Sequence, residues 1–349
     1  MSDSLRAVPT FVERERVSSE RRRRRAARPT AREWVRHGSL FFLTLLTATC
    51  AGTLFAVPQS RIAEPALPAA TTPLDYVLLV PSYLLQLLSG VSAYAFAHPE
   101  YIAQGATFAC ALLFILLAHE AGHYVACRLY GVDATLPYFI PAPPFFLAGT
   151  LGAFIKIKSP IPSRRALFDI GVAGPLAGFA ALIPVAVAAL ATAQPQLEPL
   201  PSDGLMILND PPFLRLLAPL LGVRDLAHIA PNPFYLAAWV GLLVTSLNLM
   251  PVGQLDGGHA TYAFFGARAH ARLGRLAFVV VLLLAPLGWL WHGAPSGIVY
   301  AVLLFVMLRV RHPQAEDEFE PLGRERVWAA ALTLLVFLLS FTPFPITIL

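Results

Sequence analysis

The sequence predicts an all-α polytopic membrane protein with about seven transmembrane helices, one re-entrant or interfacial helix and a small membrane-associated β-hairpin. Two observations carry this fold class. Of the 349 residues, 56% are hydrophobic and only 13% are charged, whereas soluble domains contain roughly 25% charged residues. Apolar runs long enough to cross a hydrocarbon core of about 30 Å also recur along the chain. A soluble globular protein is therefore excluded.

The chain begins with a strongly basic segment. Residues 1–37 contain eleven arginines and five acidic residues, a local charge of +6 (11 − 5), against +5 for the whole chain. We expect a disordered cytoplasmic tail that fixes the orientation of the first span and contacts anionic lipid. The five consecutive arginines at 21–25 could instead bind nucleic acid. The adjoining span favours lipid, so no nucleic-acid partner is expected.

Eight apolar segments follow the tail. They cover residues 38–57, 74–97, 106–129, 171–193, 233–250, 276–291, 298–308 with its flanks, and 327–341. Basic loops favour the cytoplasmic side. We expect the tail and three basic loops to share that side; the loops lie at 156–165, 268–275 and 309–326. This requires an even number of crossings between the tail and the first loop, so segment 74–97 cannot cross the membrane once. Pro81 and several polar residues suit a re-entrant or interfacial helix there, which leaves seven spans and an external C-terminus.

We divide the chain into four parts. These are the basic tail (1–37), an N-terminal membrane segment with its connector (38–104), a core (105–275) and the C-terminal membrane helices (276–349). The core contains one stretch with a strand pattern. From 154 to 158, phenylalanine and lysine side chains alternate with isoleucines, and Gly149 and Gly152 precede them. This two-residue period predicts a β-strand with glycines at its start.

The chemically distinctive stretch is an H-E-x-x-H motif, carried by His119, Glu120 and His123 inside the apolar segment 106–129. Positions i and i+4 share one face of a helix, so the two histidines can bind the same metal ion. Glu120 lies beside that face, where it can act as a base. Three ionisable side chains within five residues are expensive to bury in a membrane, so this cluster indicates a functional site.

A catalytic zinc site has three protein ligands, so the two histidines need one more. The candidates are Asp256, His259, Asp169, Asp133 and His270. Asp256 is the best of them, because it follows an apolar span whose end lies, by the count of crossings, at the same leaflet as the histidines. An ordinary Asp-Gly-Gly turn or a helix cap are the alternatives for this residue. We expect His259 to be a neighbour of the site and the other three to be solvated.

Taken together, these motifs resemble the site-2 protease family of intramembrane zinc metalloproteases. The resemblance covers roughly residues 100–275. It rests on H-E-x-x-H at 119–123, Gly-Val-Ala-Gly-Pro at 171–175 and the pattern N-x-x-P-x-x-x-L-D-G at 248–257. Three motifs in this order inside apolar segments are specific, whereas any one of them alone is weak.

The resemblance implies a role for each matching residue. His119, His123 and Asp256 would hold one Zn²⁺ per chain. Glu120 would be the general base and then the general acid. Asn248 would lie near the scissile carbonyl, where it positions substrate or stabilises the oxyanion. The reaction implied is cleavage of a transmembrane segment near the cytoplasmic leaflet.

The resemblance also implies how substrate is held. The 149–158 hairpin would take up an extended segment of a single-span membrane protein as an added strand, with Gly149, Gly152 and Phe154 in contact with it. The 194–232 loop, at about forty residues, is too short for a PDZ domain, so the resemblance is to the PDZ-less branch of the family. A bacterial inner membrane suits a chain without a transit-peptide pattern, with its N-terminus cytoplasmic.

Two other functions fit some of the same residues. A zinc-dependent transporter should carry charged side chains at several depths of the membrane, whereas the other spans here are nearly free of charge. A catalytically inactive scaffold that binds membrane helices would have no use for a base such as Glu120 beside two metal ligands. A metal assay coupled to the replacement of Glu120 by Gln separates the three functions.

Overall fold

The computed structural model describes residues 28–68, 72–145, 147–196, 206–295, 297–310, 312 and 315–348, and shows a mostly helical chain. Its helices are α2 (Ala31–Ala56), α3 (Pro73–Ala97), α4 (Pro99–Leu129), α5 (Arg164–Ala191), α6 (Pro212–Leu217), α7 (Pro233–Asn248), α8 (Asp256–Phe265), α9 (Ala267–His292), α10 (Gly297–Arg309) and α11 (Arg324–Ser340). Its strands are β1 (Tyr138–Pro141), β2 (Thr150–Phe154), β3 (Gln194–Pro195), β4 (Met206–Leu208), β5 (Ile229–Ala230) and β6 (Ile346–Ile348). Short 3₁₀ turns occupy Gln59–Arg61, Leu147–Gly149, Pro219–Leu221 and Leu226–His228.

Five of the described helices are long and apolar enough to cross a membrane. They are α2, most of α3 (Val77–Ala97), α4, α5 and α9. Helices α7 and α10 are apolar but shorter, and α11 has 17 residues. The chain is thus a multi-pass helical membrane protein, while the number of seven spans stays a prediction.

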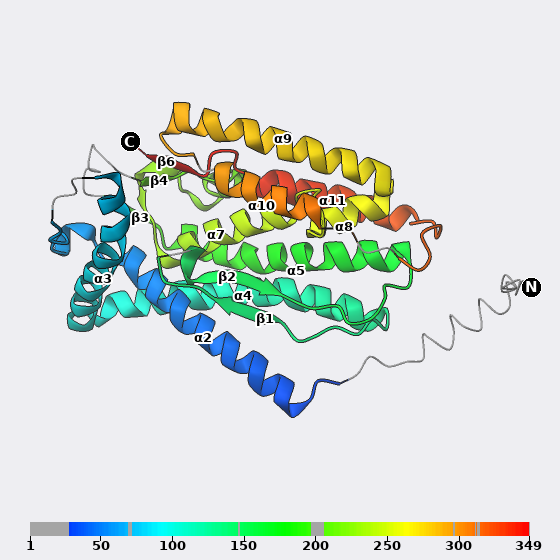
Figure 1. The fold of residues 1–349 in the computed structure, drawn as a ribbon, viewed down its shortest axis with the longest axis horizontal. Coiled ribbons are helices and arrows are strands. Elements are labelled where there is room, and N and C mark those ends of the chain that lie inside the picture. Colours follow the sequence, from blue (N-terminus) through cyan, green and yellow to red (C-terminus); the bar gives the residue numbers. More distant parts are fainter. Residues whose placement is uncertain are drawn as a thin grey trace, which may run out of the picture.

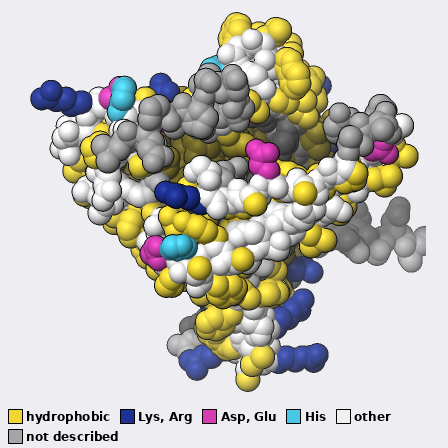
Figure 2. All heavy atoms as spheres, turned by 90° about the vertical axis from the view of Figure 1, so that its left-hand side faces the viewer, with side chains coloured by type: hydrophobic (Ala, Val, Ile, Leu, Met, Phe, Trp, Pro, Cys, Tyr) yellow, Lys and Arg dark blue, Asp and Glu magenta, His cyan; other side chains and the backbone are white. Residues whose placement is uncertain are grey.

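The direction of the helices separates α3 from the rest. Helices α2, α4, α5, α7, α9, α10 and α11 run lengthwise through the molecule, and α3 runs across them at one end (Figure 1). Viewed from that end, hydrophobic side chains are spread over the surface and charged side chains are few (Figure 2). Leu78, Leu85 and Phe96 of α3 are all more than 60% exposed. Such a surface suits contact with lipid.

Several helices begin before the apolar runs predicted from the sequence, and for two of them the cause is visible. Helix α2 begins at Ala31 because Thr30 and Glu33 form a capping box, so residues 31–37 are helical and do not belong to a disordered tail; residues 1–27 lie outside the described part. Helix α5 begins at Arg164, seven residues before the apolar run, because the Ser163 side chain accepts a hydrogen bond from the Ala166 amide.

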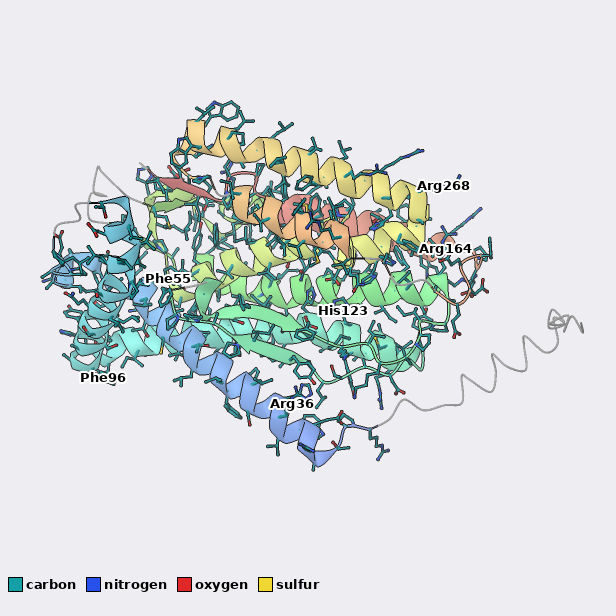
Figure 3. All side chains as sticks on the ribbon, viewed as in Figure 1. Arg36, Phe55, Phe96, His123, Arg164 and Arg268 are labelled. Atoms are coloured by element: carbon teal, nitrogen blue, oxygen red, sulfur yellow. The ribbon has the colours of Figure 1, made fainter. Side chains whose placement is uncertain are left out.

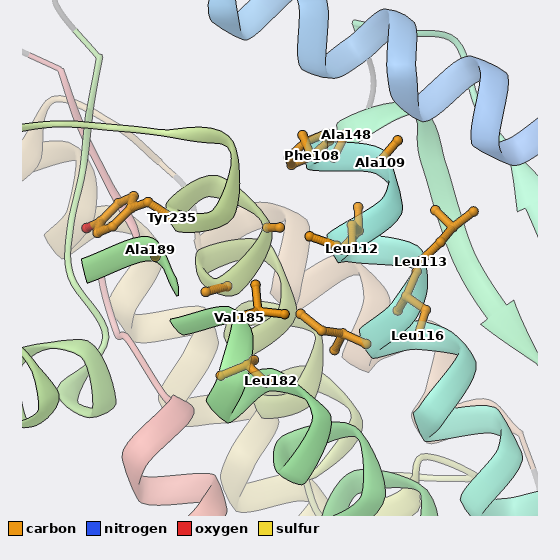
Figure 4. Close-up of a cluster of buried hydrophobic side chains, with 14 of the residues drawn as sticks. Phe108, Ala109, Leu112, Leu113, Leu116, Ala148, Leu182, Val185, Ala189 and Tyr235 are labelled. Atoms are coloured by element: carbon orange, nitrogen blue, oxygen red, sulfur yellow. The ribbon is translucent and has the colours of Figure 1, made fainter. Parts of the chain in front are cut away.

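The core lies where α4, α5 and α7 pack together (Figure 4). Its fully buried side chains include Leu112, Leu182 and Leu242, each 0% exposed. Burial from water is not what holds such helices together in lipid, because lipid tails are as apolar as leucine. Close packing holds the helices together instead. At Gly241 of α7, for example, an added methyl group would lie only 2.9 Å from the Leu182 side chain, so the two helices approach closely there.

A β-hairpin is present, but it begins earlier in the chain than the predicted 149–158. Strands β1 and β2 pair antiparallel, with Tyr138 opposite Phe154, and residues 155–158 lie beyond the end of β2. Strand β1 lies along α2, where the Phe139 ring contacts Phe41 edge-on at 5.0 Å. Among the residues that the structure describes, β2 pairs with β1 and with no other strand. One edge of the hairpin is therefore covered by α2, and the β2 edge is left without a strand partner.

Candidate metal centre

His119 and His123 lie one turn apart on α4 and point the same way. Their Nε2 atoms are 3.1 Å apart, and their exposed fractions are only 5% and 8%. Figure 3 shows His123 inside the bundle, with Arg164 and Arg268 at the end opposite Phe55 and Phe96. The motif thus forms a buried pair of imidazoles, as the i, i+4 spacing predicts.

The orientation of His123 is fixed by a backbone carbonyl. Its Nδ1 lies 2.7 Å from the carbonyl oxygen of Ile170 on α5. Because a carbonyl can only accept, Nδ1 carries the proton and donates it. The lone pair of His123 therefore lies on Nε2, the atom that faces His119. This arrangement is typical of metal-binding histidines.

Helix α5 makes room for both imidazoles with glycines. A methyl group on Gly174 would lie 2.0 Å from His123 Nε2, and one on Gly178 would lie 3.0 Å from His119 Cβ. Any larger residue at Gly174 would occupy the space that the His123 ring now fills. Gly174, from the 171–175 motif, and Gly178, one turn further along α5, thus lie directly against the histidines.

Asp256 completes the group from the first turn of α8. Its carboxylate oxygens lie 3.1 Å from His119 Nε2 and 3.2 Å from His123 Nε2. The two glycines that follow allow this turn to fold back on the preceding loop, because methyl groups on Gly257 and Gly258 would lie 2.0 Å and 2.4 Å from backbone carbonyl oxygens. The Asp-Gly-Gly sequence is therefore more than an ordinary turn.

The three side chains can hold a metal ion. Their ligand atoms all lie within 4.8 Å of one another, and no other such group of His, Cys, Asp or Glu occurs in the described part of the chain. Ligands about 2.1 Å from one tetrahedral ion are about 3.4 Å apart, close to the 3.1–3.2 Å between the nitrogens and oxygens here. Two nitrogens and one carboxylate also form a ligand set that suits zinc.

Two further polar groups border the three ligands. Glu120 is 5% exposed, and its carboxylate lies near the backbone of Ile155, the residue after β2. The Asn248 amide, at the end of α7, lies 3.5 Å from His119 Nε2. The structure thus gathers Glu120 and Asn248 around the same point, and it brings the hairpin to Glu120.

The three residues expected to contact substrate, Gly149, Gly152 and Phe154, have different surroundings. Gly149 is buried against α2, where its carbonyl accepts a hydrogen bond from the Thr47 hydroxyl at 2.7 Å. A methyl group on Gly152 would meet nothing within 4 Å, and Phe154 is 45% exposed. Gly152 and Phe154 are therefore accessible, whereas Gly149 is enclosed.

Three of the other ligand candidates lie away from the metal-ligand group. Two of these three were predicted to be solvated and are not. Asp169 lies on α5 and pairs with Arg326 at 2.5 Å, and His270 is 8% exposed within α9. Neither is in the metal-ligand group, nor is Asp133, whose amide is bonded to Ser159. His259 follows Asp256 by one turn and neighbours the site, as expected. No motif or period in the sequence indicates the contact of His123 with the Ile170 carbonyl.

Comparison with known proteins adds independent information. The family model described as Peptidase family M50 matches residues 107–285, which is 179 of the 349 residues. The probable zinc metalloprotease EGY1, chloroplastic, of Oryza sativa subsp. japonica is 32% identical over 243 residues, covering 67% of this chain and 40% of that protein.

Two proteins of Arabidopsis thaliana are also similar. The probable zinc metalloprotease EGY1, chloroplastic, is 30% identical over 66% of this chain and 42% of its own length, and EGY2, chloroplastic, is 27% identical over 76% and 46%. The chain spans less than half the length of these relatives. Their names place them in chloroplasts, so the comparisons do not support a bacterial inner membrane. No solved structure matches the chain.

Proposed function

The chain belongs to Peptidase family M50, and from this premise we propose that it is a zinc-dependent protease that cleaves transmembrane segments of other membrane proteins. One observation carries the proposal. The Nε2 atoms of His119 and His123 lie 3.1 Å from each other, and each lies 3.1–3.2 Å from one carboxylate oxygen of Asp256. A buried glutamate stands beside the two histidines on α4. This combination of three ligands and a base suits hydrolysis of a peptide bond.

Each residue of the site has a distinct task. A zinc ion held by His119, His123 and Asp256 would supply Lewis acidity toward a carbonyl oxygen and toward water. Glu120 is the group that takes a proton from the attacking water and delivers it to the leaving amine. The Asn248 side chain, 3.5 Å from His119, is placed to orient the scissile carbonyl.

Substrate would enter at the β2 edge of the hairpin. A helical segment hides its carbonyls in hydrogen bonds, so it must unwind before cleavage, and a free strand edge offers the unwound segment new partners. Phe154 and Gly152 are accessible there, and the next residue, Ile155, lies near the Glu120 carboxylate. Single-span membrane proteins are the substrate class that fits this entry route, and neither nucleic acid nor a PDZ domain has a part in it.

We propose seven spans with the N-terminus and the metal centre toward the cytoplasmic side. Arg164 and Arg268 lie at the end of the bundle from which α2 starts (Figure 3), and basic residues favour that side. Helix α3 would lie in the opposite interface, because it runs across the other helices (Figure 1). The bilayer would cover its exposed leucines.

Replacement of Glu120 by Gln tests the function. The amide has nearly the same shape as the carboxylate but cannot accept the water proton, so we expect zinc to remain and cleavage of a membrane-embedded reporter to fall by at least 10²-fold. Zinc content and cleavage are measured on the same purified, reconstituted protein. Full cleavage by this variant would refute the mechanism. A transporter or an inactive scaffold would be unaffected by the change.

A further inference from the structure

A segment between α10 and α11 crosses the ends of α5 and α8. We call it the strap and define it as His312 together with residues 315–322. The strap pairs with the start of α5, because the Arg164 amide donates a hydrogen bond to the Asp317 carbonyl oxygen at 2.8 Å. It therefore has a fixed place relative to the helix that carries the glycines under the metal centre.

The strap reaches α8 through two side chains. His312 Nε2 lies 2.9 Å from His259 Nδ1, so one of these nitrogens donates to the other. The His312 ring also stacks on Tyr262, with centroids 4.1 Å apart and planes 7° apart. The Tyr262 hydroxyl donates to Glu318 of the strap at 2.9 Å. Both contacts fall on the helix that begins with Asp256.

His259 transmits these contacts to the third metal ligand. It follows Asp256 by three residues, so the two side chains lie beside each other on the first turn of α8. The opposite side of this turn is closed by α5, where a methyl group on Gly171 would lie 2.8 Å from His259 Cβ. No side chain caps the start of α8, so the usual restraint on a first turn is missing. The His259–His312 contact takes its place.

We propose that His312 is a positioning residue for the metal centre, which acts through His259 to fix the first turn of α8 and with it the Asp256 carboxylate. The proposal rests on the metalloprotease function proposed above. A zinc ligand has to lie within about 0.2 Å of its proper distance. Residues that orient ligands in this way typically change metal affinity 10–100-fold when they are replaced.

The two histidines do not form a second metal site. Among the described residues, the group of three close ligand atoms is the one at His119, His123 and Asp256. His259 and His312 offer two nitrogens 2.9 Å apart, and a closed metal site needs four ligands. Their contact is therefore a hydrogen bond that orders a helix start.

Two variants of His312 separate the hydrogen bond from the ring stacking. His312→Phe keeps a flat ring for Tyr262 but cannot bond to His259. His312→Gln places amide atoms near the position of Nε2 and gives up the stacking. We expect zinc affinity of the full-length protein, measured in detergent by competition with a chromophoric chelator, to fall about 10-fold in His312→Phe and to stay within about twofold of wild type in His312→Gln.

Glu320→Gln provides the matched control. It weakens the strap at its ion pair with Arg165, where the atoms are 3.1 Å apart, without touching His259. We expect its zinc affinity to equal that of the wild type. The visible spectrum of the Co²⁺-loaded protein should change in His312→Phe alone, because that spectrum reports the geometry of the ligands.

The outcomes distinguish this inference from the function on which it rests. Equal zinc affinity and equal Co²⁺ spectra in wild type and His312→Phe would overturn the role of His312 and leave the metal centre intact. Equal losses in His312→Phe and Glu320→Gln would also overturn it, since attachment of the strap would then be what matters. A wild-type protein that binds no zinc would overturn the proposed function and the inference together.

Discussion

Replacement of Gly174 by Ala should remove the metal while leaving the fold largely in place. The added methyl group would lie 2.0 Å from His123 Nε2. Ordinary contact begins at about 3.4 Å, so the ring must move by about 1.4 Å (3.4 − 2.0). That shift is several times the tolerance of about 0.2 Å on a zinc–ligand distance. His123 would also leave the Ile170 carbonyl that now orients it.

The added methyl group would clash with the end of the His123 side chain and not with the backbone. Metal binding should therefore suffer more than the stability of the fold. The imidazole can turn aside without moving α4 or α5, so we expect a stability loss near the lower end of the 1–3 kcal/mol typical of overpacked sites. Zinc per chain, measured by elemental analysis of purified protein, should fall from about one to near zero. Thermal unfolding of the metal-free protein reports the stability separately.

Two other glycines serve as controls for Gly174. A methyl group on Gly122 would lie 2.4 Å from the Ala173 carbonyl oxygen, so Gly122→Ala should force the backbones of α4 and α5 apart and destabilise the fold itself. Gly38 has nothing within 4 Å of the added methyl, so Gly38→Ala should retain zinc and gain about 0.5–1 kcal/mol of helix stability. Normal zinc content in Gly174→Ala would refute the assignment of His123.

Two further substitutions test the site and its support. Asp256→Ala should lower zinc affinity by at least 10-fold, because the two remaining histidines do not complete a catalytic site; unchanged affinity would remove Asp256 from the ligand set. Arg326→Ala should cost about 1–3 kcal/mol of unfolding free energy with zinc retained, because Asp169 and the Tyr130 hydroxyl both lose their bonds to the guanidinium. Denaturation in detergent measures this loss, and an unchanged midpoint would show that Arg326 is dispensable.

The sequence sufficed for the parts of the site that depend on local geometry. His119 and His123 share a helix face because of their spacing, whatever the tertiary fold. Predicting Asp256 as a ligand required one further step. The count of membrane crossings put the end of the span before Asp256 at the same leaflet as the two histidines. In the structure its carboxylate lies 3.1 Å from His119 Nε2. The alternation at 154–158 placed extended backbone in the right region, because a period of two residues is a local signal. The strands that pair are 138–141 and 150–154, and the proline-rich first strand has no alternation that could have predicted it.

Contacts between distant segments could not be predicted in this way. Asp169 was expected to be solvated, yet it pairs with Arg326, 157 residues further along the chain. The contact of His312 with His259 spans 53 residues and depends on where the strap crosses α8. Neither contact leaves a periodic pattern, and a lone histidine between two membrane spans carries no information about its partner.

A buried metal site in a membrane bundle needs closely packed helices and also needs space for the ligand side chains. Different glycines of α4 and α5 meet these two needs. Helices in lipid associate through close packing, which favours small residues at their contacts, and Gly122 meets that need by its approach to Ala173. Gly174 and Gly178 face side chains instead, so the space they leave is filled by the two imidazoles. Because the first glycine faces backbone and the other two face metal ligands, packing and metal binding should fail independently. Small residues on the two facing helices can therefore hold the helices together and still leave room for chemistry between them.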